Sequence, residues 1–254
     1  PRSCITHLSS LRPLGLRLAV KGGGHGDYHL IVLAPYSVQE MYDFVPLGFD
    51  LAFKYRNPVM ILSDGVIGQM MEKVVLAPQR PRKTDEELKA ECGSWATQGK
   101  PAGRARNIVT SLELQSEKME VINKRLQEKY KALEENEVRY EEIGCDDADY
   151  VIVAFGSSAR ICSATVEMAR AEGLKVGLLR PITLYPFPKK PLAELAARGV
   201  KGFLSAELNA GQMVEDVRLA VNGVAPVEHF GRQGGMMFAP DEVLAALKEK
   251  LIKK

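Results

Sequence analysis

A strand–helix–strand pattern in the second half of the chain constrains the fold more than any other feature. An apolar run covers residues 150–155, and a small-residue turn, Gly156-Ser157-Ser158, leads from it into a helical pattern. A second apolar run covers residues 176–179. Two buried strands joined by a helix predict a parallel βαβ unit with a right-handed crossover. Ligands and partners of such a sheet meet the carboxyl ends of its strands, which places this turn and residues 180–188 at the functional edge.

The turn itself carries a weak functional signal. It matches neither G-x-G-x-x-G nor G-x-x-x-x-G-K-[ST], so it lacks the residues that define a dinucleotide or phosphate-binding loop. A tight strand-to-helix turn explains it better, with the Ser157 or Ser158 side chain as the helix N-cap.

Length, charge and cysteine spacing exclude several classes of protein. The 254 residues suit two modest domains or one large one. The net charge is +2, and no basic stripe is interleaved with aromatic residues, which argues against nucleic-acid binding. No apolar run has membrane-spanning length and no signal-peptide layout is present, so we expect a cytoplasmic protein without membrane contact. The four cysteines stand singly, and no zinc or iron–sulfur site is expected on this chain.

The most unusual run of the chain is Lys21-Gly22-Gly23-Gly24-His25-Gly26-Asp27-Tyr28. Its glycines tolerate positive φ and permit close backbone approach to a bound group. Lys21, His25 and Asp27 stand within this frame, so the loop can present hydrogen-bond donors and a titrating imidazole. A solvated surface loop would show the same glycines. We favour a ligand site because the glycines alternate with charged and titrating residues.

The first half of the chain shows two strands and a helix between them. Residues 30–34 and 59–62 are predicted strands, and the helix begins with capping-box spacing at Ser37 and Glu40. Pro46 is expected to bend or interrupt this helix. The second strand ends in Ser63-Asp64-Gly65, which the residues alone predict as a turn. Two strands are too few for a stable parallel sheet, so this domain is expected to be incomplete at its N-terminus.

A connector separates the two halves. Prolines, glycines and charges oppose a packed element over residues 66–106, and residues 111–137 predict a long charged helix with a narrow apolar stripe. Val138 and Tyr140 alternate with charges and predict an edge strand. Strands and helices then alternate after the βαβ unit: helix 190–198, strand 202–206, helix 211–221, strand 224–230 and helix 240–251. This order predicts a complete α/β layer fold.

Three regions carry a resemblance to a known family. They are KGGGHGDYHLIVLAPYSVQEM, KYRNPVMILSDGVIGQMME, and DADYVIVAFGSSARI together with RPITLYPFP and ELNAGQM. These runs resemble the alpha subunit of 2-oxoacid:ferredoxin oxidoreductases lacking its N-terminal part, and within that family the type acting on branched-chain 2-oxoacids such as 2-oxoisovalerate.

The resemblance implies an α/β fold in three regions. Residues 1–77 would be the C-terminal portion of an incomplete thiamine-diphosphate pyrimidine-binding domain. Residues 78–147 would form the connector with the long charged helix. Residues 148–254 would form a transketolase C-terminal-like α/β/α domain.

The resemblance also implies an activity, with cofactors and partners. Enzymes of this family use thiamine diphosphate to decarboxylate a 2-oxoacid oxidatively, pass electrons through iron–sulfur clusters to ferredoxin, and transfer the acyl group to coenzyme A. The thiamine diphosphate would be shared with a beta subunit, and magnesium and the clusters would lie on partner subunits. Expected partners are the beta subunit, gamma and ferredoxin-like delta subunits, and ferredoxin. The family's aminopyrimidine-contacting glutamate and its Gly-Pro-Ser-Thr-Gly arginine run are not in this chain, so it is not expected to be active alone.

Site residues follow from the same resemblance. His25 and Asp27 would be catalytic, with His25 bonding the substrate or an intermediate and Asp27 orienting it. The implied cofactor-binding residues are Lys21, Gly24, Gly26, Asp64 and Gly65, and no metal ligand is implied. The strand-edge loops at residues 156–160, 180–186 and 207–212 are expected to form subunit contacts.

Two other functions stay open from the residues. One is a transketolase-like subunit of a lipoamide-linked 2-oxoacid dehydrogenase, which would need no ferredoxin. The other is a non-catalytic assembly module in which the α/β domain and the long helix serve as docking surfaces.

Overall fold

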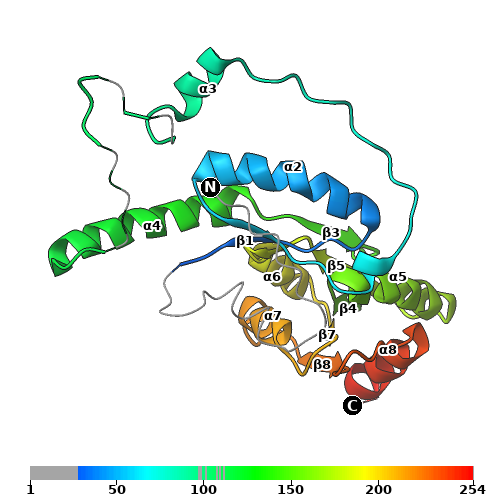
Figure 1. The fold of residues 1–254 in the computed structure, drawn as a ribbon. Coiled ribbons are helices and arrows are strands. Elements are labelled where there is room, and N and C mark those ends of the chain that lie inside the picture. The colour runs from blue at the N-terminus through cyan, green and yellow to red at the C-terminus, as the bar shows by residue number, and fades with distance from the viewer. Residues whose placement is uncertain are drawn as a thin grey trace. The chain divides into compact units, whose positions relative to one another are not determined.

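A computed structural model of the chain describes residues 28–96, 99–100, 102–106, 108, 110 and 112–253 (Figure 1). The described residues up to Val74 and those from Leu126 onward form one compact unit, and Val75–Arg125 form a second. No helix among the residues described is both long enough and apolar enough to cross a membrane.

A five-stranded sheet forms the core of the first unit. Its strands run in the order β3-β5-β4-β7-β8. Their bounds are β3 Tyr140–Ile143, β4 Tyr150–Val153, β5 Val176–Pro181, β7 Gly202–Glu207 and β8 Val227–Gly231. Strands β4, β5, β7 and β8 are parallel, whereas β3 lies antiparallel to β5 at one edge. The predicted parallel βαβ arrangement and the predicted edge strand are both confirmed.

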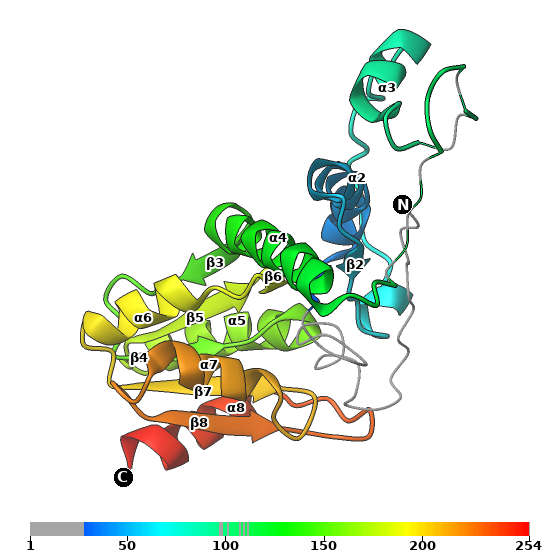
Figure 2. The same cartoon turned by 90° about the vertical axis from the view of Figure 1, so that its left-hand side faces the viewer.

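Helices cover both faces of this sheet (Figure 2). They are α5 Gly156–Ala171, α6 Lys189–Ala197, α7 Met213–Val221 and α8 Pro240–Leu247, which continues into a π-helical turn at Lys248–Ile252. Side chains of successive strand residues point to opposite faces. Ile152 accordingly packs in the cluster with α5 and α8, while Val151 and Val153 pack in the cluster with α6 and α7. All three are fully buried, as expected for a strand covered on both sides.

A second, three-stranded sheet has the order β2-β1-β6. Strands β1 (Ile31–Leu33) and β2 (Val59–Ile61) are parallel, and β6 (Thr183–Tyr185) lies antiparallel to β1. The sequence did not predict β6, because its three residues stand between Pro181 and Pro186 and are too few to show a period. The third strand of this sheet therefore comes from the second half of the chain.

Helix α2 (Val38–Tyr55) connects β1 and β2 and packs its buried residues against them. Its N-cap is Ser37, as predicted, and the Ser37 side chain accepts from the Glu40 N–H. The Glu40 carboxylate bonds the Tyr36 N–H at 2.9 Å. Pro46 was expected to bend or interrupt this helix; it lies inside a continuous helix, so an interruption is wrong, whereas the bend stays a prediction. A proline removes one helix hydrogen bond, and here packing of the flanking residues Phe44 and Gly48 keeps the helix continuous.

The connector contains more helix than the sequence predicted. A 3-10 turn covers Ile67–Gln69, α3 covers Asp85–Cys92 and α4 covers Ser116–Asn136. Helix α3 lies in the charge-rich run expected to oppose structure; it forms because Thr84 and Glu87 make a capping box, and none of its residues is buried. In α4, only Tyr130 and Leu133 are buried. They lie in the part of α4 that belongs to the first unit and pack in one cluster with α2 residues.

Candidate functional site

The turns that follow β1 and β2 meet the second half of the chain. Strands β1 and β2 are parallel, so both end at the same edge of the three-stranded sheet. After β1 the chain turns through residues 34–37, and after β2 it turns through residues 62–65. Side chains from both turns, and from the segments that follow them, bond α5 and β5 of the five-stranded sheet.

Asp64 makes the contact after β2. Its Oδ2 accepts from the Ser157 N–H at 2.9 Å and from the Ser157 hydroxyl at 2.7 Å. Its Oδ1 accepts from the Val66 N–H at 3.0 Å and the Ile67 N–H at 2.9 Å. A carboxylate offers about four lone-pair positions. All four bonds come from this chain, so the geometry accounts for Asp64 as a bridge between two turns.

Arg180 makes the contact after β1. Arg180 is 2% exposed, and its guanidinium donates two hydrogen bonds to the Glu40 carboxylate, at 2.8 and 2.9 Å. Its Nε donates to Glu141 at 2.8 Å, and its Cζ atom lies 3.8 Å from the centre of the Tyr36 ring. Paired, planar bonding of this kind is what makes arginine suited to buried ion pairs. Arg180 thereby fixes the start of α2 on β5.

Glu72 and Arg160 make a third contact. Glu72 accepts from Arg160 Nη2 at 2.6 Å and from the Val38 N–H at 3.0 Å. The Arg160 bond, followed by that of the Val38 N–H, holds the pKa of Glu72 below its ordinary value. Together, Glu40, Asp64 and Glu72 with Ser157, Arg160 and Arg180 form what we call the carboxylate seam.

A fourth carboxylate occupies the start of α7. Glu207 ends β7, is 1% exposed, and accepts from the N–H groups of Gln212, Met213 and Val214 at 2.8–3.0 Å. The Ser205 hydroxyl donates a further bond at 2.9 Å. The chain leaves β4 toward β5 on one side and leaves β7 toward β8 on the other, so β4 and β7 flank the topological switch point of the sheet. Ligands of open α/β sheets bind at such a point.

Both helix N-termini at this switch point are already bonded to side chains of the chain itself. Asp64 bonds the first turn of α5, and Glu207 bonds the first turn of α7. A helix N-terminus attracts phosphate through its free N–H groups and its dipole. These two positions therefore do not fit a diphosphate group.

The nearby polar atoms do not change this conclusion. Gln212 Oε1 and His229 Nε2 are buried without a hydrogen-bond partner in the described part of the chain. Burial lowers the pKa of His229, which makes the neutral imidazole the favoured form and adds no positive charge for a diphosphate. Among the residues described, no group of three or more His, Cys, Asp or Glu side chains could hold a metal ion.

The predicted site residues fall into two groups. Lys21, Gly24, His25, Gly26 and Asp27 lie outside the described residues. Asp64 and Gly65 lie in the turn after β2, and Gly65 is exposed. The run that contains His25 leads into the amino end of β1, whereas Asp64 follows the carboxyl end of β2. Their assignment to one cofactor site stays a prediction.

The start of α5 differs from the prediction. The N-cap residue is Phe155, and Ser157 and Ser158 lie inside the helix. The expected serine cap is therefore wrong: the Ser157 N–H receives its acceptor from Asp64. The loops at Gly156–Arg160 and at Arg180 were expected to contact other subunits, and here they bond the N-terminal half of this same chain.

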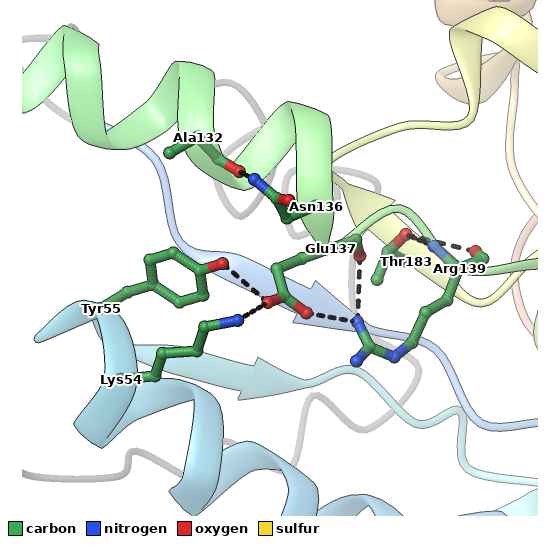
Figure 3. Close-up of polar contacts among 7 residues, drawn as sticks. All are labelled: Lys54, Tyr55, Ala132, Asn136, Glu137, Arg139 and Thr183. Carbon is green, nitrogen blue, oxygen red and sulfur yellow. Dashed lines mark hydrogen bonds and ion pairs between the residues drawn. The ribbon is translucent and has the colours of Figure 1, made fainter.

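A second carboxylate cluster surrounds the buried Glu137, which follows α4 (Figure 3). Glu137 is 3% exposed and accepts from Lys54 Nζ at 2.7 Å, the Tyr55 hydroxyl at 2.7 Å and Arg139 Nη1 at 2.9 Å. Burial raises the pKa of Glu137, but these three bonds outweigh burial and lower that pKa to about 2. The cluster joins the end of α2 to the segment between α4 and β3.

Sequence reasoning missed both clusters. One signal was available: Arg180 stands in the otherwise apolar run of β5, and a charge in a buried strand requires a partner. Glu40, Glu72 and Glu137 carry no such signal, because charged residues are common at helix ends and in connectors.

Two family models match the chain in consecutive order. The thiamine-diphosphate-binding model of pyruvate flavodoxin/ferredoxin oxidoreductases matches residues 13–138, and the model of pyruvate:ferredoxin oxidoreductase core domain II matches residues 148–243. The 2-oxoglutarate synthase subunit KorA of Methanocaldococcus jannaschii is 32% identical over 249 residues, which cover 92% of this chain and 67% of that protein.

The chain belongs to the 2-oxoacid:ferredoxin oxidoreductase family. The ketoisovalerate oxidoreductase subunit VorB of Methanothermobacter marburgensis is 48% identical over 230 residues, which cover 91% of this chain. These residues span 63% of that relative, less than two thirds of its length. The resemblance drawn from the sequence is confirmed.

A solved structure supports the fold of this family member. The 2-oxoglutarate:ferredoxin oxidoreductase from Magnetococcus marinus, with 2-oxoglutarate, coenzyme A and succinyl-CoA bound, matches with a TM-score of 0.69. The match covers 92% of this chain and 44% of that one at 23% identity. The predicted α/β fold class is confirmed: a region that matches the thiamine-diphosphate-binding model is followed by an α/β/α region that matches core domain II.

Proposed function

We propose that the chain is part of the alpha-type subunit of a thiamine-diphosphate-dependent 2-oxoacid:ferredoxin oxidoreductase. The proposed reaction is oxidative decarboxylation of a branched-chain 2-oxoacid to its acyl-CoA, with electrons passing to ferredoxin. The observation that carries this proposal is the 48% identity, over 91% of the chain, to a ketoisovalerate oxidoreductase subunit. The identity to a 2-oxoglutarate synthase subunit is lower, at 32%. A branched-chain 2-oxoacid is therefore proposed as the substrate in preference to 2-oxoglutarate.

Within this subunit, the run from Lys21 to Asp27 is the proposed cofactor-facing segment. His25 would contact the substrate or an intermediate, with Asp27 orienting its ring, and Lys21, Gly24 and Gly26 would lie beside the cofactor. Asp64 and Gly65 complete the proposed set. Since the Asp64 carboxylate already accepts four bonds within the chain, its contribution would be to hold its turn in place.

We propose that a beta subunit shares the thiamine diphosphate and holds its diphosphate group. The occupied N-termini of α5 and α7 support this division. Magnesium and the iron–sulfur clusters would lie on partner subunits, with gamma and ferredoxin-like delta subunits completing a cytoplasmic complex. The three proposed regions of the chain are residues 1–77, 78–147 and 148–254, as the sequence predicted.

Anaerobic purification of the tagged chain from its native cells tests this proposal. Native mass spectrometry should find a beta subunit bound to it, and the complex should contain thiamine diphosphate and iron. Recovery with a lipoamide acyltransferase would replace the proposal with a lipoamide-linked dehydrogenase. Recovery without partners, thiamine diphosphate or iron would favour an assembly module.

A further inference from the structure

The first turn of α5 is shaped around a carboxylate from a distant segment. Asp64 Oδ2 accepts both the N–H and the hydroxyl of Ser157, which is 93 positions away in sequence. Gly156 has φ +58°, and a Cβ at this position would lie 3.0 Å from Asp64 Oδ2. A larger residue at position 156 would therefore be strained and would crowd the carboxylate.

Helix α5 has no side-chain cap from its own N-cap residue. That residue is Phe155, which cannot accept a hydrogen bond through its side chain. A Ser, Thr, Asp or Asn side chain at this position would satisfy one of the first N–H groups of the helix. The first turn of this 16-residue helix therefore has donors that Phe155 leaves unsatisfied, and it presents them, with the positive end of the helix dipole, to Asp64.

The other carboxylate oxygen fixes the segment that follows. Asp64 Oδ1 accepts from the Val66 and Ile67 N–H groups at the 3-10 turn. Eight residues after Asp64, Glu72 bonds Arg160 in the same helix, α5. The segment 64–72 is therefore held on α5 at both of its ends.

We propose that Asp64 is a positioning residue that serves as a built-in carboxylate ligand for the N-terminus of α5. The bonds between Asp64 and α5 hold the segment 64–72 on the five-stranded sheet. Glu72, at the end of this segment, accepts from the Val38 N–H and so supports the start of α2. The position left by removal of this side chain accepts a small free carboxylate such as formate. The inference goes beyond the proposed function, since it requires no substrate or cofactor.

Chemical rescue in the 254-residue chain tests the proposal. Asp64→Ala should lower the melting temperature by roughly 5 °C, since it removes charge-assisted bonds from two turns. Sodium formate should restore at least about half of this loss in a saturable manner, relative to sodium chloride at equal ionic strength. The wild-type chain should show no formate-specific gain. Equal melting temperatures of the variant in formate and chloride, or an equal formate gain in the wild type, would overturn the proposal.

Further variants keep the proposal falsifiable if Asp64→Ala does not fold. Asp64→Asn retains the size of the side chain and removes its charge, and Ser157→Ala removes one donor. Ser157→Ala should lower the melting temperature less in the Asp64→Asn background than in the wild type. Additive losses would contradict direct coupling. Asp146→Ala, at an exposed carboxylate, is the matched control and should leave the melting temperature unchanged.

A last measurement separates this inference from the proposed function. In the assembled complex, a positioning role predicts that Ser157→Ala and Asp64→Asn weaken thiamine diphosphate binding to a similar, small extent. If Asp64 instead contacts the cofactor, only its own substitution will weaken binding, and formate will not rescue stability. The melting-temperature measurements test the role of Asp64 even if the complex catalyses a different reaction from the one proposed.

Discussion

Glu137 joins three parts of the molecule through one buried carboxylate. Lys54 and Tyr55 end α2, and Arg139 stands just before β3 (Figure 3). Arg139 also exchanges backbone bonds with the Thr183 hydroxyl of β6, at 2.9 and 3.2 Å. The Glu137 side chain therefore links the end of α2 to Arg139, which bonds β6 of the three-stranded sheet and directly precedes β3 of the five-stranded sheet.

Replacing this carboxylate should destabilise the chain. Glu137→Gln keeps the size of the side chain and removes the charge, leaving Arg139 without its ionic partner. We expect a loss of about 1–3 kcal/mol in the free energy of unfolding, because Glu137 is buried while its two cations are partly exposed. Urea denaturation measures this loss. The matched control is Glu135→Gln, whose carboxylate is exposed and 4.0 Å from Lys131, and it should cost under about 0.5 kcal/mol. Equal losses in the two variants would show that the cluster adds no stability.

The same carboxylate should make stability depend on pH. The folded pKa of Glu137 is lowered from 4.5 to about 2, so its contribution is present above about pH 5 and is lost as the pH falls toward 2. The shift corresponds to at most about 3.4 kcal/mol. Denaturation at pH 6 and pH 3 should show a larger loss in the wild type than in Glu137→Gln. An identical pH dependence in both proteins would contradict this assignment.

Single residues were the hardest part of the structure to predict. The Asp64 turn could be read from Ser63-Asp64-Gly65, but its partner Ser157 is 93 positions away. No local pattern encodes a bond of that separation. Ser157 was correctly placed at the start of a helix, and its hydroxyl donates to a carboxylate where an N-cap hydroxyl was expected to accept.

At the scale of elements, α5 is bounded by two glycines with positive φ. Gly156 has φ +58° at its start and Gly173 has φ +83° after its end. Their surroundings differ, because a Cβ at Gly173 would meet nothing within 4 Å, whereas one at Gly156 would meet Asp64. Substitutions at Gly173 therefore report the backbone strain of a positive φ alone, whereas substitutions at Gly156 report this strain together with the contact to the Asp64 carboxylate.

Alanine at each position should therefore have different effects. Gly173→Ala should lower the free energy of unfolding by about 1 kcal/mol, because alanine is strained in the left-handed backbone conformation of this position. Gly156→Ala should cost at least about 1 kcal/mol more, since it also displaces the Asp64 carboxylate. Thermal and urea denaturation compare the two variants. Combining each change with Asp64→Ala should remove most of the difference, and a difference that persists would assign it to another contact.

Elements with a strong period were predicted well, and short ones were not. Strands β4, β5 and β7 show largely apolar runs and β3 alternates with charges, and every strand of the five-stranded sheet was located from the sequence within a few residues. Strand β6 has three residues and is defined by its pairing with β1, a tertiary contact. Helix α3 depends on its capping box and has no apolar face to reveal it. The unbroken α2 shows that packing overrides the local preference of Pro46.

At the scale of the whole molecule, two halves of the chain build one sheet. Strand β6 extends the sheet that β1 and β2 begin, and the carboxylate seam bonds the same halves at the strand ends. The two family models match consecutive segments of the chain, but the three-stranded sheet contains strands from both segments: β1 and β2 from the first and β6 from the second. The order of domains could be predicted from sequence, whereas this sharing of a strand could not.

The proposed catalytic role of His25 gives a prediction for the assembled complex. His25→Ala should lower kcat by about 100-fold, the scale of a lost general acid or base, with less change in the amount of complex recovered. His7→Ala, in the N-terminal stretch without a proposed role, is the control. Turnover measured with the 2-oxoacid and coenzyme A checks this, and unchanged turnover in His25→Ala would remove His25 from the proposed site.

The most direct test of the central claim is the electron acceptor of the purified complex. The complex containing this chain should reduce ferredoxin when supplied with 2-oxoisovalerate and coenzyme A, and should do so faster than with 2-oxoglutarate. Omission of coenzyme A or removal of thiamine diphosphate should abolish acyl-CoA formation. Transfer of the acyl group to lipoamide without reduction of ferredoxin would contradict the account.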